Sequence, residues 1–452
     1  MKALTLHNVR IEHHTWRLAV TGCAAIDLLL RKVTPADLQK FQEYLASELL
    51  SAESRLSVLT VRKGRRSERI RALIRRAPEL RTRLHQHRTA LITREKLLRD
   101  RCGVLRQLGD ACAWIVLRGD PRLLVPLYGA ERSHRLPTGL GFDGPWEILN
   151  QLHATGEFLV IANDLTRCLG IGDLTITPLN RSWTAPLSLE IKSRPGEGRF
   201  AEIEMFSAYA NHPEFQALFA DVVRALNLQE TEPGAVRDAR IQRQMQELLE
   251  RLSVVFELRA KPRERTRAAK ERHWRTVETV LNRAYMAGSA FDEPEPGVLF
   301  TAIRVYQNRA VEASIRRLTE IAAEQGQPLS GATTRDLFEA PKISPVVPPI
   351  ALWPITGDLR NSLLAGRLFF AVYVARDAWS KAFSDLGINW REEGGCWHLD
   401  LDGEKVILDR IETARAKLGV VFAGVSPRSA AAAIRATILN PVGDIHTKPE
   451  HR

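Results

Sequence analysis

The sequence is poor in cysteine, short of lysine and free of long apolar runs. Its five cysteines lie far apart, with none in a CxxC pair and none near a histidine at zinc-site spacing. A disulfide-stapled scaffold and a zinc ribbon are therefore excluded, and a reducing compartment is favoured. The sequence has no Walker A motif, so nothing in it indicates ATP hydrolysis.

The most apolar early stretch, Leu18 to Leu30, is too short to span a membrane and contains Thr21 and Asp27. It begins too far along the chain, behind two histidines and an arginine, to resemble a secretory signal. We therefore expect a cytoplasmic protein that does not associate with membranes.

The composition is that of a globular protein with an excess of positive charge. At about 150 residues per domain, 452 residues suggest two to four domains. The 65 basic residues exceed the 53 acidic ones, for a formal charge of +12. A polyanionic partner is expected, most often nucleic acid. Arginine outnumbers lysine about four to one, which suits bidentate binding of phosphate but also follows from a GC-rich genome.

One basic segment, residues 62–101, contains fifteen basic residues and four acidic ones. Leucines at helical spacing predict helices here, with a break near Pro78. Aromatic residues are absent from the segment, so it would grip phosphates without stacking on bases. A solvated helical face explains the charges equally well. The candidate phosphate contacts are Arg65, Arg66, Arg69, Arg75 and Arg76.

The pattern of elements predicts a mixed α+β fold. Thr34-Pro35 reads as a helix start, because threonine caps a helix and proline suits its first position. We divide the chain by changes in composition and periodicity. The expected parts are a helical Arg-rich N-terminal region over 1–126, a core over 127–306 with a helical insertion at 213–290, a helical connector over 307–340, a Pro-rich linker over 341–357 and a C-terminal α+β unit over 358–452.

Short apolar runs in the core predict three strands, which are followed by a helix through Phe200 and Tyr209. The expected strands are 158–161, 173–177 and 187–192, with a fourth at 298–305 that closes the core around the insertion. An apolar stripe over 241–256 could serve as a dimer interface or as an internal core. In the C-terminal unit we expect a helix from Leu368 to Trp379 and a strand entering a turn at 397–403.

Two segments of the core carry residues suited to phosphodiester chemistry, Gly172-Asp173 and Glu190-Ile191-Lys192. Residues two apart on a strand share a face, so Glu190 and Lys192 point the same way. A hairpin with a loop around 178–186 would bring Asp173 beside Glu190. Two carboxylates can then hold a Mg²⁺ ion, or Mn²⁺ in its place, while Lys192 orients water or stabilises developing charge.

At these residues the sequence resembles the PD-(D/E)XK, or restriction-endonuclease-like, nuclease superfamily, over about residues 130–212. The family's metal-binding Asp maps onto Asp173, its second acid onto Glu190 and its Lys onto Lys192, although Gly172 stands where the nominal motif has proline. The resemblance implies a restriction-endonuclease-like core and a metal-dependent DNA nuclease, with DNA favoured over RNA. A role in restriction or anti-phage defence, a homodimer and a partner protein encoded nearby are compatible with it.

The family usually adds an acid from a preceding helix. Glu147, on a helix that Gly144-Pro145 would open, is the first candidate, and Glu157 is the second. An acid in a first helical turn also complements the helix dipole without any metal. The alternatives to a nuclease site are a solvated surface hairpin and a degenerate nuclease fold. The rival function is a non-catalytic nucleic-acid-binding or scaffold protein.

Overall fold

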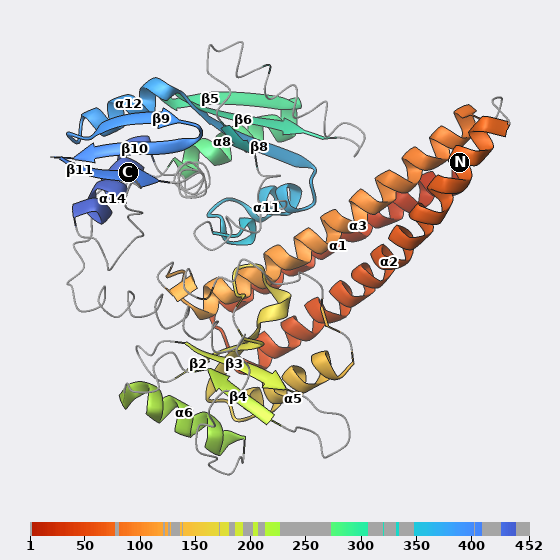
Figure 1. Ribbon diagram of the computed structural model, residues 1–452, viewed down its shortest axis with the longest axis horizontal. Coiled ribbons are helices and arrows are strands. Elements are labelled where there is room, and N and C mark those ends of the chain that lie inside the picture. The colour runs from red at the N-terminus through yellow and green to blue at the C-terminus, as the bar shows by residue number, and fades with distance from the viewer. Residues whose placement is uncertain are drawn as a thin grey trace, which may run out of the picture. The chain divides into compact units, whose positions relative to one another are not determined.

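The computed structural model divides into two compact units, each of which is described by itself (Figure 1). The first unit comprises Met1–Gly119 and Glu131–Val236, and the second comprises Asp120–Ala130 and Arg237–Arg452. The structure describes residues 2–76, 81–120, 123–124, 127, 136–137, 139–170, 172–179, 186–192, 202–206, 213–226, 273–305, 320, 331–333, 348–401, 403–408 and 426–439.

Three long helices form an arm in the first unit (Figure 1). They are α1 (Lys2–Arg31), α2 (Pro35–Arg76) and α3 (Arg81–Val116). At 1.5 Å per residue, α2 is about 63 Å long. The helix start at Thr34 is confirmed, because the Asp37 amide donates a hydrogen bond of 3.1 Å to Thr34 Oγ1. Helix α2 is described to Arg76 and α3 from Arg81, and Pro78, near which a break is expected, lies outside the described residues.

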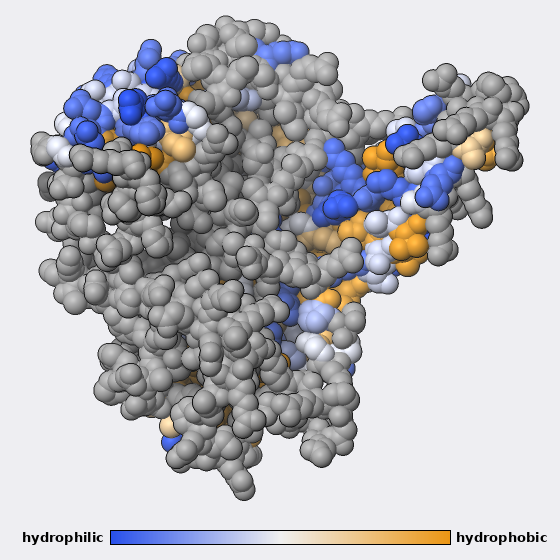
Figure 2. Space-filling model, in the orientation of Figure 1, coloured by the Kyte–Doolittle hydropathy of each residue, from blue (hydrophilic) through white to orange (hydrophobic). Residues whose placement is uncertain are grey.

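The arm is held together by apolar side chains and close helix contact. Ile11 of α1, Leu59 of α2 and Leu91 of α3 belong to one buried cluster. At Gly22 a Cβ atom would lie 2.3 Å from Leu108 Cδ1, so glycine permits α1 and α3 to approach closely. Hydrophobic and hydrophilic residues are mixed on the exposed surface of the arm (Figure 2).

An antiparallel sheet with strand order β1-β2-β3-β4 completes the first unit. Its elements are α5 (Leu140–Ala154), β1 (Phe158–Ala162), η2 (Asn163–Leu165), β2 (Leu174–Pro178), β3 (Leu187–Lys192), β4 (Glu202–Phe206) and α6 (Pro213–Ala225). The three expected strands are confirmed. The helix expected through Phe200 and Tyr209 is wrong, because Glu202–Phe206 pairs with β3 as a strand.

The outer edge of β1 is closed by side chains. Gln42 of α2 donates from Nε2 to the Val160 carbonyl at 2.8 Å, and its Oε1 accepts from the Ala162 amide at 2.8 Å. His153 of α5 accepts from the Val160 amide at 3.0 Å through Nε2. The buried Gln42 therefore acts as a strand partner for β1 and satisfies backbone groups that would otherwise lack partners.

The second unit contains a four-stranded antiparallel sheet in the order β5-β6-β8-β7. Its elements are α8 (Trp274–Ala287), β5 (Ser289–Glu295), β6 (Val298–Arg304), β7 (Gly331–Thr333), η6 (Ile350–Leu352), α11 (Gly357–Leu364) and β8 (Leu368–Val374). The strand expected at 298–305 exists, but it pairs with β5 and β8. The expectation that it closes the sheet of β1–β3 is therefore wrong. The stripe at 241–256 lies outside the described residues.

A smaller sheet, β11-β10-β9, follows in the C-terminal part of the second unit. The elements are α12 (Arg376–Ser384), β9 (Asn389–Glu393), β10 (Cys396–Leu401), β11 (Glu404–Leu408) and α14 (Pro427–Leu439). Trp397 packs edge-on against Trp379, with ring centroids 4.7 Å apart. The strand entering a turn is confirmed. The helix expected from Leu368 to Trp379 is wrong over its first half, which is the fully buried strand β8.

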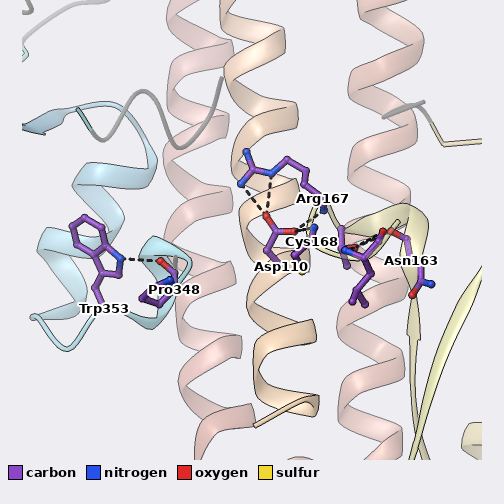
Figure 3. Close-up of polar contacts among 8 residues, drawn as sticks. Asp110, Asn163, Arg167, Cys168, Pro348 and Trp353 are labelled. Carbon is purple, nitrogen blue, oxygen red and sulfur yellow. Dashed lines mark hydrogen bonds and ion pairs between the residues drawn. The ribbon is translucent and has the colours of Figure 1, made fainter. Parts of the chain in front are cut away.

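The end of the segment interpreted as a linker packs into the second unit. Ile350 and Trp353 are buried there, and the Trp353 ring lies 6.3 Å from that of Phe370. Trp353 Nε1 also donates to the Pro348 carbonyl at 3.1 Å (Figure 3). Together the elements make a mixed α+β protein. Among the helices in the described part of the chain, none carries an apolar stretch that could cross a membrane.

Candidate active site

The β2–β3 hairpin brings the two segments singled out in the sequence into register. Leu174 pairs with Leu189, and Asp173 directly precedes Leu174, so its backbone lies beside the part of β3 that contains Leu189 and Glu190. The Asp173 amide donates a hydrogen bond of 2.5 Å to the Leu189 carbonyl. Leu189 and Ile191 are buried. Positions 190 and 192 alternate with them along the strand, and their side chains lie outside the described residues.

Gly172 makes the close approach of the two strands possible. Its φ angle is +68°, in the left-handed region that favours glycine. A Cβ atom at this position would lie 2.7 Å from the Leu189 carbonyl oxygen and 2.3 Å from Ser188 Oγ. Glycine is therefore needed directly before Asp173, where the nominal family motif has proline.

Asn163 fixes the loop that leads to Asp173. Its Nδ2 donates to the Gly172 carbonyl at 3.1 Å, and its amide donates to the Asp173 carbonyl at 2.9 Å. Its Oδ1 accepts from Thr175 Oγ1 at 2.8 Å. Sequence reasoning missed this buried residue, because no motif marks contacts that span nine to twelve residues.

The Asp173 carboxylate already has a backbone partner. The Ile191 amide donates to Asp173 Oδ2 at 2.7 Å. This bond holds the carboxylate over the end of β3, in the position that a strand neighbour would otherwise occupy. A carboxylate has about four acceptor sites, so one such bond orients it without exhausting its capacity for a metal ion.

Strand β4 adds acidic positions that the sequence analysis did not consider. Glu204 pairs with Glu190, and Glu202 pairs with Lys192. Directly opposed residues of antiparallel strands lie on the same face of a sheet. Positions 190 and 204 therefore share one face of the β3–β4 pair, and the Asp173 carboxylate is held next to them by the Ile191 amide. Only the backbone register is described for Glu202 and Glu204.

The two candidate helix acids are differently placed. Helix α5 begins at Leu140, so the expectation that Gly144-Pro145 opens it is wrong, and Glu147 lies beyond its second turn. Glu147 Oε1 accepts a long hydrogen bond of 3.4 Å from Gln151 Nε2. Glu157 is exposed just before β1. Its carbonyl accepts from the Leu179 amide, at the opposite end of the β1–β2 pair from Asp173.

A buried ion pair ties α3 to the loop between η2 and β2 (Figure 3). Asp110 Oδ2 accepts from Arg167 Nε at 3.0 Å and from Nη2 at 2.9 Å. Asp110 Oδ1 accepts from the amides of Arg167 and Cys168 at 2.6 and 3.0 Å. Gly109 allows this contact, because a Cβ atom there would lie 2.1 Å from the Leu165 carbonyl oxygen. The pair thus supports the loop that carries Asn163 and leads to Asp173.

The arginines expected to contact phosphates are only partly described. Arg65, Arg66, Arg69, Arg75 and Arg76 lie on the backbone of α2, and their side chains fall outside the described residues. Elsewhere on the arm, basic side chains pair with acids. Arg101 forms an ion pair with Glu48, and Arg106 forms one with Glu53 at 3.0 Å.

Comparisons with known proteins leave the family resemblance untested. No protein-family model matches the chain, and neither a curated protein nor a solved structure shows significant similarity to it. Within the described side chains, no group of three or more His, Cys, Asp or Glu residues is placed to hold a metal ion. Those side chains do not include Glu190, Glu202 or Glu204.

His153 should make the first unit sensitive to acid. Burial lowers the pKa of this histidine to about 4 from its usual 6.5. The folded protein holds it neutral, so its contribution to stability is complete above pH 6.5 and is lost as the pH falls toward 4. Between pH 7.5 and 4.5 we expect this residue to cost roughly 2–3 kcal/mol of the free energy of unfolding.

Urea unfolding at the two pH values tests this expectation. The His153→Gln variant should lose less of its free energy of unfolding on acidification than the wild type. Other carboxylates titrate in both proteins, so the difference between the two losses isolates His153. Equal losses would show that His153 is protonated in the folded state.

Proposed function

We propose that this protein is a metal-dependent nuclease that hydrolyses DNA phosphodiester bonds. The observation that carries the proposal is the pairing of β2 with β3, which brings the Asp173 carboxylate to the Ile191 amide, one residue along β3 from Glu190. Gly172 and Asn163 hold the Asp173 backbone, and the Ile191 amide holds its carboxylate. The resemblance to PD-(D/E)XK nucleases assigns chemistry to the same positions, and the net charge of +12 favours a nucleic-acid partner.

The acidic residues at this end of the sheet suit a Mg²⁺ ion, since carboxylate oxygens are its preferred protein ligands. Asp173 and Glu190 would hold it, with Mn²⁺ as a possible substitute. Such an ion acidifies a water molecule and neutralises charge on the phosphate. Lys192, two residues from Glu190 on the same strand, would orient the water or stabilise the charge that develops on the phosphate oxygens. We include in this proposal that the nuclease acts in restriction or anti-phage defence.

One observation favours a non-catalytic nucleic-acid-binding or scaffold protein. The bond from the Ile191 amide to Asp173 Oδ2 gives Asp173 a structural task, capping the end of β3. In a degenerate nuclease fold this cap alone would explain why an aspartate follows Gly172. Cleavage of supercoiled plasmid and linear DNA, each with Mg²⁺ and with a chelator, separates the two functions. Purified protein that binds both DNAs but cleaves neither would support the second.

The pairing of Glu204 with Glu190 also identifies which further acid to test. We expect Glu204→Gln to lower the rate of Mg²⁺-dependent cleavage by roughly 10- to 100-fold, the usual cost of losing a group that supports a metal site. Glu157→Gln is the matched control and should leave the rate unchanged, because Glu157 lies at the far end of β1. A larger loss in Glu147→Gln than in Glu204→Gln would instead assign the third acid to α5.

A further inference from the structure

Where the antiparallel helices α2 and α3 pack against each other, one glutamate is paired with two basic side chains. Lys63 Nζ donates to Glu95 Oε2 at 2.6 Å, and Arg99 Nη2 donates to Glu95 Oε1 at 2.8 Å. The hydrogen bond from Lys63 is the main reason that the pKa of Glu95 is lowered. Glu95 is thus shared by two cations, and its bond to Lys63 helps to fix the position of α3 along α2.

Three further arginines lie near this part of α2 and α3 and form no ion pair among the described residues. Arg55 and Arg62 are exposed on α2 and lie seven residues apart, which puts them on one face about 10 Å from each other. Arg94 of α3 precedes Glu95 and is half-buried. Burial lowers the pKa of Arg94, and repulsion from Arg55 and Arg62 lowers it further. The three guanidinium groups therefore lie within electrostatic range of one another.

The surroundings of this arginine trio (Arg55, Arg62 and Arg94) supply little negative charge. Arg94 Nε is buried without a hydrogen-bond partner. Across the described part of the chain, no carboxylate forms an ion pair with any of the three. Burial is the main cause of the lowered pKa of His14 on α1, and the charges of Arg101, Arg17 and Arg55 lower it further. The opposing Glu48 is already paired with Arg101.

The trio stands on a rigid base. Leu59 lies between Arg55 and Arg62 on α2 and packs into the buried cluster that contains Ile11 and Leu91. The backbones that carry the three arginines are therefore held in place before any ligand arrives, which reduces the entropy lost on binding. A purely solvated face would be expected to spread its cations or pair them, as Lys63 and Arg99 are paired with Glu95. Neighbouring guanidinium groups without a carboxylate partner are instead suited to a bound oxyanion.

We propose that Arg55, Arg62 and Arg94 form a phosphate-binding site on the helical arm that takes backbone phosphates of duplex DNA. This inference rests on the DNA partner of the proposed function, and it is independent of cleavage. Such contacts carry no base information, so the site binds DNA of any sequence.

The test measures binding of a fluorescent duplex of about 30 base pairs over a series of salt concentrations. Each phosphate contact adds about 0.9 to the slope of log affinity against log salt concentration. We expect the triple variant Arg55→Gln, Arg62→Gln and Arg94→Gln to flatten this slope by about two to three units. The matched control, Arg275→Gln, Arg283→Gln and Arg428→Gln, removes the same charge from exposed sites of the second unit and should change the slope by less than one unit.

A thermal measurement without DNA gives a second readout. Tripolyphosphate at constant ionic strength should raise the Tm of the wild type and the control, because a bound anion relieves the repulsion within the trio. It should not raise that of the triple variant, whose own Tm should equal or exceed the wild-type value. This result also shows that the triple variant is folded.

Several results of these two measurements would contradict the phosphate site. An unchanged salt slope in the triple variant, an equal change in both variants, or no duplex binding by the wild type overturns it. A trio-dependent response to tripolyphosphate with an unchanged duplex slope also overturns it, because the site would then take a free polyphosphate. Trio-dependent binding of DNA that is never cleaved supports the site and refutes the nuclease.

Discussion

Single substitutions of Glu190 and Lys192 to alanine, and of Asp173 to asparagine, should each reduce Mg²⁺-dependent DNA cleavage by at least 100- to 1000-fold. In the proposed site, Asp173 and Glu190 are the two carboxylate ligands of the metal ion, and Lys192 is the nearest cationic residue to Glu190 along β3. Asparagine is chosen at position 173 because its Oδ1 can still accept the hydrogen bond that the Ile191 amide gives to Asp173. The substitution thus removes the charge and keeps the cap.

The measurement is the initial rate of plasmid nicking at saturating Mg²⁺, together with DNA affinity. Affinity should survive in all three variants, because these residues contribute little to a charge-driven footprint. Glu157→Gln serves as the active control. Full cleavage by Glu190→Ala would show that the metal site does not lie on β3. A loss of both cleavage and the helical circular dichroism signal would indicate misfolding. In the latter case Glu190→Gln, which keeps the side-chain volume, repeats the test.

The largest stability loss is expected from Asp110→Ala. Asp110 is fully buried and accepts four hydrogen bonds, two from the Arg167 guanidinium and two from backbone amides. Its removal leaves a buried cation and two buried amides without that partner. Breaking a buried pair in this way typically costs 3–5 kcal/mol. At 2–4 °C per kcal/mol for a unit of this size, the Tm should fall by roughly 10 °C.

Asp221→Ala is the matched control for a surface ion pair. Asp221 and Arg224 are paired at 3.2 Å on α6, with the Arg224 side chain 78% and the Asp221 side chain 25% exposed. Loss of this ion pair should change the Tm by only about 1–2 °C, since ion pairs at the surface contribute little to stability. Differential scanning calorimetry compares the two variants with the wild type. Equal Tm values for Asp110→Ala and the control would mean that Arg167 finds another partner or reaches solvent.

The strands around the candidate site could be predicted because each is a short apolar run bounded by glycine or proline. The same reasoning failed at β4. Phe200, Ile203 and Phe206 recur every three residues and so match a helix, while Ile203 and Met205 alternate with Glu202 and Glu204 and match a strand equally well. Pairing with β3 selects the strand. That choice depends on a tertiary contact, so the acidic position of Glu204 could not be found from the sequence.

The strand β8 was missed for a different reason. All seven of its residues are buried, so neither face is polar and no alternation marks it as a strand. The residues that support Asp173 were also beyond sequence reasoning. Asp110 and Arg167 lie 57 positions apart, and a lone aspartate in a long helix carries no sign of its partner. The pattern thus identified residues suited to the chemistry, and long-range contacts determine how they are held.

The amide of Gln42 has a consequence for any attempt to isolate the sheet. It closes the edge of β1 from 118 residues away, so the segment that resembles a nuclease, about 130–212, does not contain all of its own edge. Excised from the arm, this segment would expose β1 as a free template for pairing with another chain. We expect it to self-associate, and we expect newly synthesised chains to complete this sheet only after α2 is in place.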